Sequence, residues 1–321
     1  MDTAIIAGVD LGGTAIKVAL FDTTGAMLGK TQVPTPVQEG IDTIISTIHH
    51  TVLNLIGEIK LDKTKLLGIG VGVPGFVDEK TGVILEAVNL HCKNVPLRDS
   101  LQKLANVPVF IGNDANNAAL GEMWQGSGKG ANDLVAITLG TGVGGGVIVG
   151  GQVIQGVTGA GGEIGHISIV PSGGPQCNCG KTGCLETYTS ATAIKREGNR
   201  AAQEQTSPFL AERLSSQGKV NAKDVFDAAI AGDEAALAIV DQAAYYLGLG
   251  LSHLATILNP AKIVIGGGVS AAGDFLFDRV RASFKQFTLP ICYDACEILP
   301  ATTGNDAGVI GAAWLVYNDQ V

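Results

Sequence analysis

The chain has 321 residues, a length that suggests about two domains. It carries 21 lysines and arginines against 30 aspartates and glutamates, and the net charge of -9 argues against a nucleic-acid surface, which needs clustered basic residues. Hydrophobic residues make up 46% and charged residues only 16%, so a disordered chain is excluded and a large core is expected.

Two stretches without charged residues raise the question of a membrane span. Residues 134–162 are rich in glycine and would form a poor helix, whereas residues 242–261 continue an amphipathic run from Asp233 and are interpreted as a buried core helix. No basic segment followed by an apolar run opens the sequence, so we predict no secretory signal. A cytoplasmic protein without a membrane partner is therefore expected.

Strands and helices alternate in the first part of the chain, which is typical of an α/β domain. Apolar spacing predicts helices over 40–57 and 97–105. Apolar runs predict strands over 5–9, 15–21, 67–73 and 107–111, with a further strand after the glycine turn at 23–25.

A second set of strands begins at residue 134 and repeats the plan of residues 5–30: strand, turn of Gly and Thr, strand, glycine turn, strand. Hairpins with glycine turns are common. Because both turns pair glycine with threonine at the same place, we interpret the pattern as an internal duplication. Farther along, caps and apolar spacing predict a helix over 221–231, a long helix from Asp233 to 259, a strand over 261–265 and a final helix over 306–316.

Two glycine turns are candidates for phosphate binding. After Asp10, backbone amides exposed by the glycines at 12 and 13 could surround phosphate oxygens, and Thr14 and Lys17 could add donors, with a divalent cation between Asp10 and the phosphate. A tight hairpin explains this turn almost as well. A second turn of the same composition over 139–146 favours the phosphate interpretation, since the pair could hold one nucleotide. Neither turn fits the Walker or the dinucleotide-binding pattern.

Asp114 follows a predicted strand and immediately precedes a helical run over 116–124. In isolation this position is best interpreted as a helix N-cap. Beside two phosphate turns, the better interpretation is a general base that accepts a proton from an attacking hydroxyl.

Three cysteines crowd into eight residues, and a histidine precedes them. Cys177, Cys179 and Cys184 with His166 form a set of soft ligands that suits a tetrahedral zinc. This set leaves no open position for water, so the zinc is predicted to be structural. Three free buried thiols are the alternative, and His166 is chosen as the histidine nearest in sequence.

Two carboxylates, Glu163 and Glu186, flank this cluster. They are interpreted either as solvated loop residues or as acceptors for the hydroxyls of a polyol, since a carboxylate can accept two hydroxyl donors.

Together these motifs resemble the ROK family of sugar kinases and related repressors, within the actin/hexokinase/Hsp70-like ATPase superfamily. The resemblance covers essentially the whole chain, and its most specific block runs from Cys177 to Glu186. Bacterial ATP-dependent glucokinases of this family are closest in pattern. The implied fold is a two-domain α/β fold of the actin/hexokinase (ribonuclease H-like) type with a cleft between the domains. A small domain over 1–118 with a returning C-terminal helix over 305–321 would join a large domain over 119–304 that carries the zinc loop.

The resemblance also implies roles for individual residues. Asp114 matches the catalytic base, and the residues that match the zinc ligands are His166, Cys177, Cys179 and Cys184. The residues that match contacts to the sugar are Gly75, Asn89, Asn113, Asp114, Glu163, His166 and Glu186. The residues that match the nucleotide site, with Asp10 near magnesium, are Asp10, Gly12, Gly13, Thr14, Lys17, Thr141, Gly142, Gly266, Gly267 and Gly268.

The reaction implied by the resemblance is phosphoryl transfer from ATP, with Mg²⁺, to the 6-hydroxyl of glucose, a step of glycolysis. Kinases for fructose, mannose, N-acetylmannosamine or allose are alternatives, because hydrogen-bond geometry at single hydroxyls decides sugar specificity. The resemblance further implies a homo-oligomer, either a dimer or a tetramer. Cys92 stands in a loop where the family often carries tryptophan, so looser packing near the sugar is expected.

Two other classes of function are less favoured. A sugar-sensing repressor of this family would carry a DNA-binding domain ahead of the strand that starts at residue 5, and the chain is acidic. A catalytically silent sugar-binding module would have no need of Asp114 and both phosphate turns.

Overall fold

The computed structural model describes residues 4–321, and the chain divides into two compact units. Unit 1 comprises the chain up to Gly130, the segment Val153–Gly161 and the segment Thr303–Val321, while unit 2 comprises Ala131–Gln152 and Gly162–Thr302. These limits differ from the expected division at 118, because α3 (Asp114–Gln125) is one continuous helix within unit 1.

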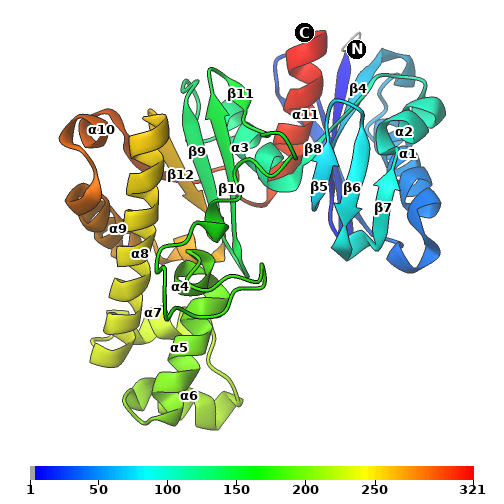
Figure 1. The fold of residues 1–321 in the computed structure, drawn as a ribbon. Helices are drawn as coiled ribbons and strands as arrows, with labels where there is room; N and C mark the ends of the chain where they lie inside the picture. The colour runs from blue at the N-terminus through cyan, green and yellow to red at the C-terminus, as the bar shows by residue number, and fades with distance from the viewer. Residues whose placement is uncertain (1–3) are drawn as a thin grey trace. The chain divides into compact units, whose positions relative to one another are not determined.

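Unit 1 is built on a five-stranded sheet with the strand order β3-β2-β1-β4-β8 (Figure 1). β1 pairs antiparallel with β2 and parallel with β4, and β4 pairs parallel with β8. The predicted strands are confirmed with small shifts at their ends. They are β1 (Ile5–Leu11), β2 (Ala15–Phe21), β3 (Met27–Pro34), β4 (Leu66–Val73) and β8 (Val109–Asn113).

Helices cover both faces of this sheet (Figure 1). Alternate side chains of β1, such as Ile5 and Val9, pack in one apolar cluster with α1 (Ile41–Glu58) and α2 (Leu97–Ala105). Ile6 points to the other face and packs with α11 (Ala307–Gln320). Because both faces are buried, the strand carries a continuous apolar run instead of alternating with polar residues.

Glycines bring α3 and α11 unusually close together. A Cβ added to Gly311 would lie 1.6 Å from the carbonyl oxygen of Asn117, and one added to Gly121 would lie 2.2 Å from that of Ala307. Neither position can accept a side chain without movement of the backbone. This packing holds α3, which begins at Asp114, against the C-terminal helix.

A small antiparallel sheet in unit 1 was missed at the level of sequence. Its strands have only three to five residues, too few to show a clear period, and β7 carries two exposed polar residues. They are β5 (Phe76–Asp78), β6 (Val83–Ala87) and β7 (Cys92–Val95), with η3 (Val88–Leu90) between the last two. The remaining short helices of unit 1 are η1 (Val37–Glu39), η2 (Lys63–Lys65) and η6 (Gly304–Asp306).

Unit 2 contains a sheet with the same plan, in the order β11-β10-β9-β12-β13. β9 pairs antiparallel with β10 and parallel with β12, which in turn pairs parallel with β13, as β1, β2, β4 and β8 do in unit 1. The internal duplication is therefore confirmed. The strands are β9 (Leu134–Leu139), β10 (Val143–Val149), β11 (Gln152–Val153), β12 (Lys262–Gly266) and β13 (Glu297–Pro300).

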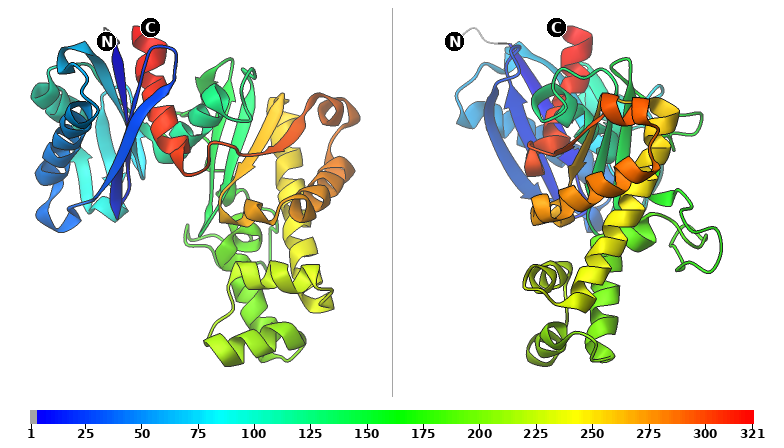
Figure 2. Two further views of the ribbon diagram at one scale, coloured as in Figure 1. Left: turned by 180° about the vertical axis from the view of Figure 1, so that it is seen from behind. Right: turned by 90° about the vertical axis from the view of Figure 1, so that its left-hand side faces the viewer.

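The helices of unit 2 include three, α5, α6 and α7, that gather at one end of this unit, away from its sheet (Figure 2). Asn221 caps α7 through a capping box, as its sequence pattern predicts. The helices are α4 (Glu186–Thr189), α5 (Ala191–Gln203), α6 (Pro208–Gln217), α7 (Ala222–Ile230), α8 (Glu234–Leu258), α9 (Asp274–Phe287) and α10 (Pro290–Ala295), with η4 (Ile164–His166) and η5 (Gly268–Ala272).

The long helix α8 is the only helix among residues 4–321 whose length and composition would suit a membrane span, and core helices of soluble proteins meet the same criterion. Val240, Leu247 and Leu251 on α8 are buried in the apolar core of unit 2. The prediction of a buried core helix is confirmed.

Candidate functional site

Asp114 lies at the junction between β8 and α3, and its neighbour Asn113 determines its surroundings. The Asn113 Oδ1 accepts hydrogen bonds from the backbone amides of Ala115, at 2.9 Å, and Asn116, at 3.1 Å, so Asn113 is the N-cap of α3. Its Nδ2 donates to the carbonyl oxygen of Gly75 at 2.9 Å. The N-cap interpretation of Asp114 is therefore wrong, because the preceding residue fills that role. Gly75, which lies 38 residues earlier in the sequence, is thus bonded to the residue that precedes Asp114.

The surroundings of Asp114 strengthen its hold on a proton. Burial raises the pKa of the Asp114 carboxyl, a hydrogen bond from the Ala115 amide opposes this, and the negative charge of Asp10 raises the pKa further. A carboxylate with a raised pKa is a better proton acceptor for an alcohol than one in free solution. Two carboxylates that sense each other's charge also suit a divalent cation.

Asp10 lies near the end of β1, opposite Lys17 of β2 in the hairpin register. The Lys17 Nζ is 3.4 Å from the Asp10 Oδ2 and also donates to the carbonyl oxygen of Asn305 at 3.2 Å. A Cβ added to Gly308 would lie 2.9 Å from the Asp10 carboxyl carbon, so the first turn of α11 lies against this carboxylate. The positive end of that helix and the lysine both favour negative charge here.

The first glycine turn is held by a residue that sequence reasoning missed. The Thr35 hydroxyl donates to the carbonyl oxygen of Gly12 at 2.6 Å, and the Thr35 amide donates to that of Thr14 at 3.0 Å. A Cβ added to Gly13 would lie 3.1 Å from the Cβ of Asn89, which places this predicted sugar residue against the turn. Nothing local in the sequence marks Thr35, because its partners lie more than twenty residues earlier.

The second glycine turn, in unit 2, is joined to Glu186. The Glu186 Oε2 accepts a hydrogen bond from the Val143 amide at 2.9 Å, and a Cβ added to Gly142 would lie 2.2 Å from the same oxygen. Thr141, beside them, is exposed. A carboxylate predicted to bind sugar and a turn predicted to bind phosphate are therefore neighbours.

A third glycine turn, Gly266 to Gly268, begins at the end of β12 and packs on the second turn. Gly266 pairs with Thr138, and Gly267 has a φ of +88°. A Cβ added to Gly267 would lie 2.4 Å from the carbonyl oxygen of Leu139. Gly268 follows at the start of η5. The predicted nucleotide glycines of unit 2, Gly142 and Gly266 to Gly268, thus lie at or just after the ends of two adjacent parallel strands, β9 and β12.

A compact group of potential metal ligands is formed by His166, Cys177, Cys179 and Cys184, whose ligand atoms all lie within 4.8 Å of one another. The Cys177 Sγ is 3.5 Å from the His166 Nδ1, and the Cys179 Sγ is 3.6 Å from the Cys184 Sγ. In a tetrahedral zinc site with bonds of about 2.3 Å to sulfur, sulfur atoms lie roughly 3.7 Å apart. The donor set and its spacing therefore fit a zinc ion, and His166 is the histidine in the cluster.

The two glutamates flank this cluster in the structure as well as in the sequence. A Glu163 carboxylate oxygen is 3.8 Å from the His166 Nε2, and the Glu186 Oε1 is 3.8 Å from the Cys177 Sγ. Lys181 donates to the carbonyl oxygen of His166 at 2.7 Å and closes the loop. Each carboxylate therefore contacts one member of the cluster: Glu163 contacts His166, and Glu186 contacts Cys177.

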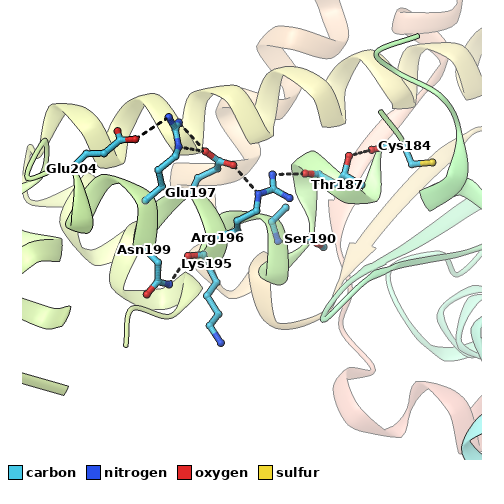
Figure 3. Close-up of polar contacts among 10 residues, drawn as sticks. Cys184, Thr187, Ser190, Lys195, Arg196, Glu197, Asn199 and Glu204 are labelled. Atoms are coloured by element: carbon cyan, nitrogen blue, oxygen red, sulfur yellow. Dashed lines mark hydrogen bonds and ion pairs between the residues drawn. The ribbon is translucent and has the colours of Figure 1, made fainter. Parts of the chain in front are cut away.

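The helix that begins at Glu186 is anchored to α5 (Figure 3). Arg196 donates to the carbonyl oxygen of Thr187 at 3.0 Å and pairs with Glu197 at 2.9 Å, and the Thr187 hydroxyl donates to the carbonyl oxygen of Cys184 at 2.7 Å. These bonds connect the metal cluster, the short helix and α5.

A hollow of about 550 Å³ lies elsewhere in unit 1. It is lined by polar groups that include Glu79, Arg98, Gln102 and Asp319. None of the predicted site residues lines it. Cys92 packs against the apolar core of unit 1, and burial raises the pKa of its thiol, so this thiol is less reactive than a free one.

Two sheets of the same strand order, each with a glycine turn between its first two strands, define the actin/hexokinase-like class of folds. The ROK family model matches residues 6–319, and the chain belongs to this family. A ROK hexokinase from Thermus thermophilus superposes with a TM-score of 0.83 at 34% identity, covering 98% of this chain and 99% of that chain.

Two further relatives carry a more specific description. A glucokinase from Halalkalibacterium halodurans is 49% identical over 98% of this chain and 95% of that protein. A ROK family glucokinase from Streptomyces griseus, crystallised in complex with glucose and AMPPNP, has a TM-score of 0.76 at 34% identity, covering 97% of this chain and 99% of that chain.

Proposed function

We propose that this protein is an ATP-dependent glucokinase that phosphorylates the 6-hydroxyl of glucose. The observation that carries the proposal is the 49% identity to a glucokinase over nearly the whole of both chains. The raised pKa of Asp114 and the glycine turns of both units supply groups of the kind that phosphoryl transfer to an alcohol requires.

In this proposal Asp114 accepts the proton of the sugar 6-hydroxyl as its oxygen forms a bond to the terminal phosphorus of ATP, and ADP leaves with the electrons of the broken bond. The proposed sugar contacts are Asn113, Asn89, the backbone of Gly75, Glu163, His166 and Glu186.

The nucleotide is proposed to bind at the glycine turns, where Lys17 and Thr14 donate to phosphate oxygens. Mg²⁺ near Asp10 would neutralise phosphate charge. The proposed nucleotide residues are Asp10, Gly12, Gly13, Thr14, Lys17, Thr141, Gly142, Gly266, Gly267 and Gly268.

A structural zinc ion is proposed for His166, Cys177, Cys179 and Cys184. When bound it would fix the loop from which Glu163 and Glu186 extend, because four protein ligands leave no coordination position for a substrate. His166 would then present its ring to the sugar in one orientation.

The test of the proposed reaction is a coupled assay of ADP release with glucose, fructose, mannose, N-acetylmannosamine and allose. We expect the highest kcat/KM with glucose. A higher value with another hexose would assign the enzyme to that sugar, and the absence of ADP release with every hexose would contradict the kinase proposal.

The cell compartment and the assembly are also proposals. We infer a cytoplasmic enzyme that forms a dimer or tetramer, on the basis of the family resemblance. Light scattering should give two or four times the chain mass of 32.8 kDa. The mass of a single chain in solution would contradict this inference.

A further inference from the structure

Glu79 is a carboxylate outside the described site, in the turn between β5 and β6, and the turn holds it firmly. The Asp78 Oδ1 accepts hydrogen bonds from the amides of Lys80 at 3.0 Å and Thr81 at 3.3 Å. From α2, Arg98 donates to the carbonyl oxygens of the same two residues, at 3.0 and 2.8 Å. The backbone of Lys80 and Thr81, which follow Glu79, is therefore hydrogen-bonded through both its amides and its carbonyls.

The carboxylate of Glu79 reaches the residue that precedes Asp114. It accepts one hydrogen bond from the backbone amide of Asn113 and another from the side-chain amide of Gln155. β8 is an edge strand, so amides that point outward from it have no strand partner. Glu79 supplies the missing acceptor at the last residue of this strand.

The end of β8 is also confined from its two sides. A Cβ added to Gly112 would lie 2.5 Å from the Asn117 Oδ1 and 3.4 Å from the Glu79 Oε1. Asn117 is fully buried on α3. The strand end therefore passes between a buried amide and the Glu79 carboxylate, with little room to shift toward either.

We propose that Glu79 is a positioning residue for phosphoryl transfer: its carboxylate holds the backbone of Asn113 and thereby orients the adjacent Asp114. The inference rests on the proposed role of Asp114 as the base. Asn113 is then bound at three points, through its amide by Glu79, through its Nδ2 by Gly75, and through its Oδ1 by the first turn of α3.

Glu79 changes between its neutral and its ionised form near neutral pH. Burial raises the pKa of Glu79 to about 7, although the bonds from Asn113 and Gln155 lower it in part. The other charged groups that line the same hollow are Arg98 and Asp99 of α2 and Asp319 of α11. A charged acceptor forms a stronger bond to an amide than a neutral one, so the Asn113 amide is held best when Glu79 is ionised.

The experiment compares Glu79→Ala, Glu79→Gln and the control Glu86→Gln, which alters a glutamate of the same hairpin that pairs with Lys93 at 2.6 Å. We expect Glu79→Ala to lower kcat about 10-fold with little change in the KM for ATP, because a base displaced by a fraction of an ångström loses rate more than binding. Glu79→Gln, which keeps the shape, should restore most of the rate.

The pH profile separates positioning from simple stabilisation. The kcat of the wild type and of Glu86→Gln should rise as the pH passes about 7, and Glu79→Gln should lack this step. Hydrogen exchange at the Asn113 amide should quicken in Glu79→Ala, a readout that does not depend on activity.

Distinct outcomes separate the two proposals. A rise of kcat near pH 7 that is as large in Glu79→Gln as in Glu86→Gln, or Glu79→Ala with the kcat of the control, would overturn the positioning role. If Glu79→Ala fails to fold, the profile of Glu79→Gln decides. A wild type inactive on all hexoses would instead overturn the kinase proposal, and the exchange rate of the Asn113 amide would still test the contact.

Discussion

At the scale of single residues, the proposed chemistry depends on which of two neighbours caps a helix. Asn113 caps α3 with its side chain, whereas the Asp114 carboxylate accepts a hydrogen bond from the Ala115 amide, at 2.9 Å, and burial together with Asp10 raises the pKa of Asp114. An aspartate at position 113 would place a second negative charge beside the base. The asparagine therefore suits the proposed proton transfer.

Substitution Asp114→Asn should lower kcat by more than about 100-fold, because it removes the proton acceptor and keeps the shape. Glucose binding, measured by calorimetry, should persist, since the amide can still hydrogen-bond a hydroxyl. A variant that retains wild-type turnover would contradict the role of Asp114 as the base.

The pH dependence of stability should report on Glu79. An unfolded glutamate has a pKa of about 4.3, whereas the pKa of Glu79 in the folded protein is about 7. Between these values the folded state binds more protons than the unfolded state, so this group lowers the stability as the pH rises through that window.

Glu79→Gln cannot ionise and should escape this loss. Its free energy of unfolding relative to the wild type should therefore increase from pH 5 to pH 8 in urea titrations. Glu86→Gln, on the same hairpin, is the control and should show no such trend. An equal difference at both pH values would show that Glu79 ionises at an ordinary pH.

At the scale of elements, the cysteine loop and the contact between α3 and α11 can each be tested. The cysteine loop has few apolar residues of its own, and Gly180 and Gly183 adopt positive φ angles of +89° and +72° that allow it to turn on itself. A metal ion would replace the missing apolar core of this loop.

Substitution Cys179→Ser should release zinc, lower the melting temperature and weaken glucose binding, because the loop that carries Glu163 and His166 would lose its anchor. Cys92→Ser, outside the cluster, is the matched control and should keep its metal. Elemental analysis measures the stoichiometry, and an unchanged zinc content in Cys179→Ser would contradict the proposed ligand set.

The contact between α3 and α11 offers a second test. Gly311→Ala should destabilise the protein by about 1–3 kcal/mol or more, because its Cβ would overlap the carbonyl oxygen of Asn117. Gly57→Ala lies in α1, where no atom stands within 4 Å of the added Cβ, and should stabilise by about 0.4–1 kcal/mol. Urea denaturation compares the two, and equal effects would contradict the packing argument.

At the scale of the whole molecule, two units share one strand order and place their glycine turns after corresponding strands. The net charge of -9 would repel a polyanion such as DNA. An acidic protein that binds phosphate must rely on local donors instead of a general attraction, and the proposed donors here are backbone amides of the glycine turns and Lys17.

Duplex DNA should accordingly show no mobility shift with this protein at about 150 mM salt, with or without glucose. A shift that responds to sugar would favour the repressor alternative over the kinase. A basic DNA-binding protein of similar mass serves as the positive control.

Much of the fold could be predicted from the sequence, because its strands are apolar runs and its caps are local. The small sheet of β5, β6 and β7 could not, since strands of three to five residues are too short to show a period. Helices α5, α6 and α9 were also missed, although the buried residues Leu276, Val280 and Phe284 of α9 recur at helical spacing.

The sequence by itself determined the family, the repeated plan and the cluster of one histidine and three cysteines, because these depend on residue types at short spacings. The structure also showed that Asn113, and not Asp114, caps α3, a local choice that the residue types left open. Only the tertiary structure decided that Thr35 supports the first turn and that Glu79 holds the end of β8. Such contacts join residues far apart along the chain, and their formation depends on how strands and helices pack, which no local pattern records.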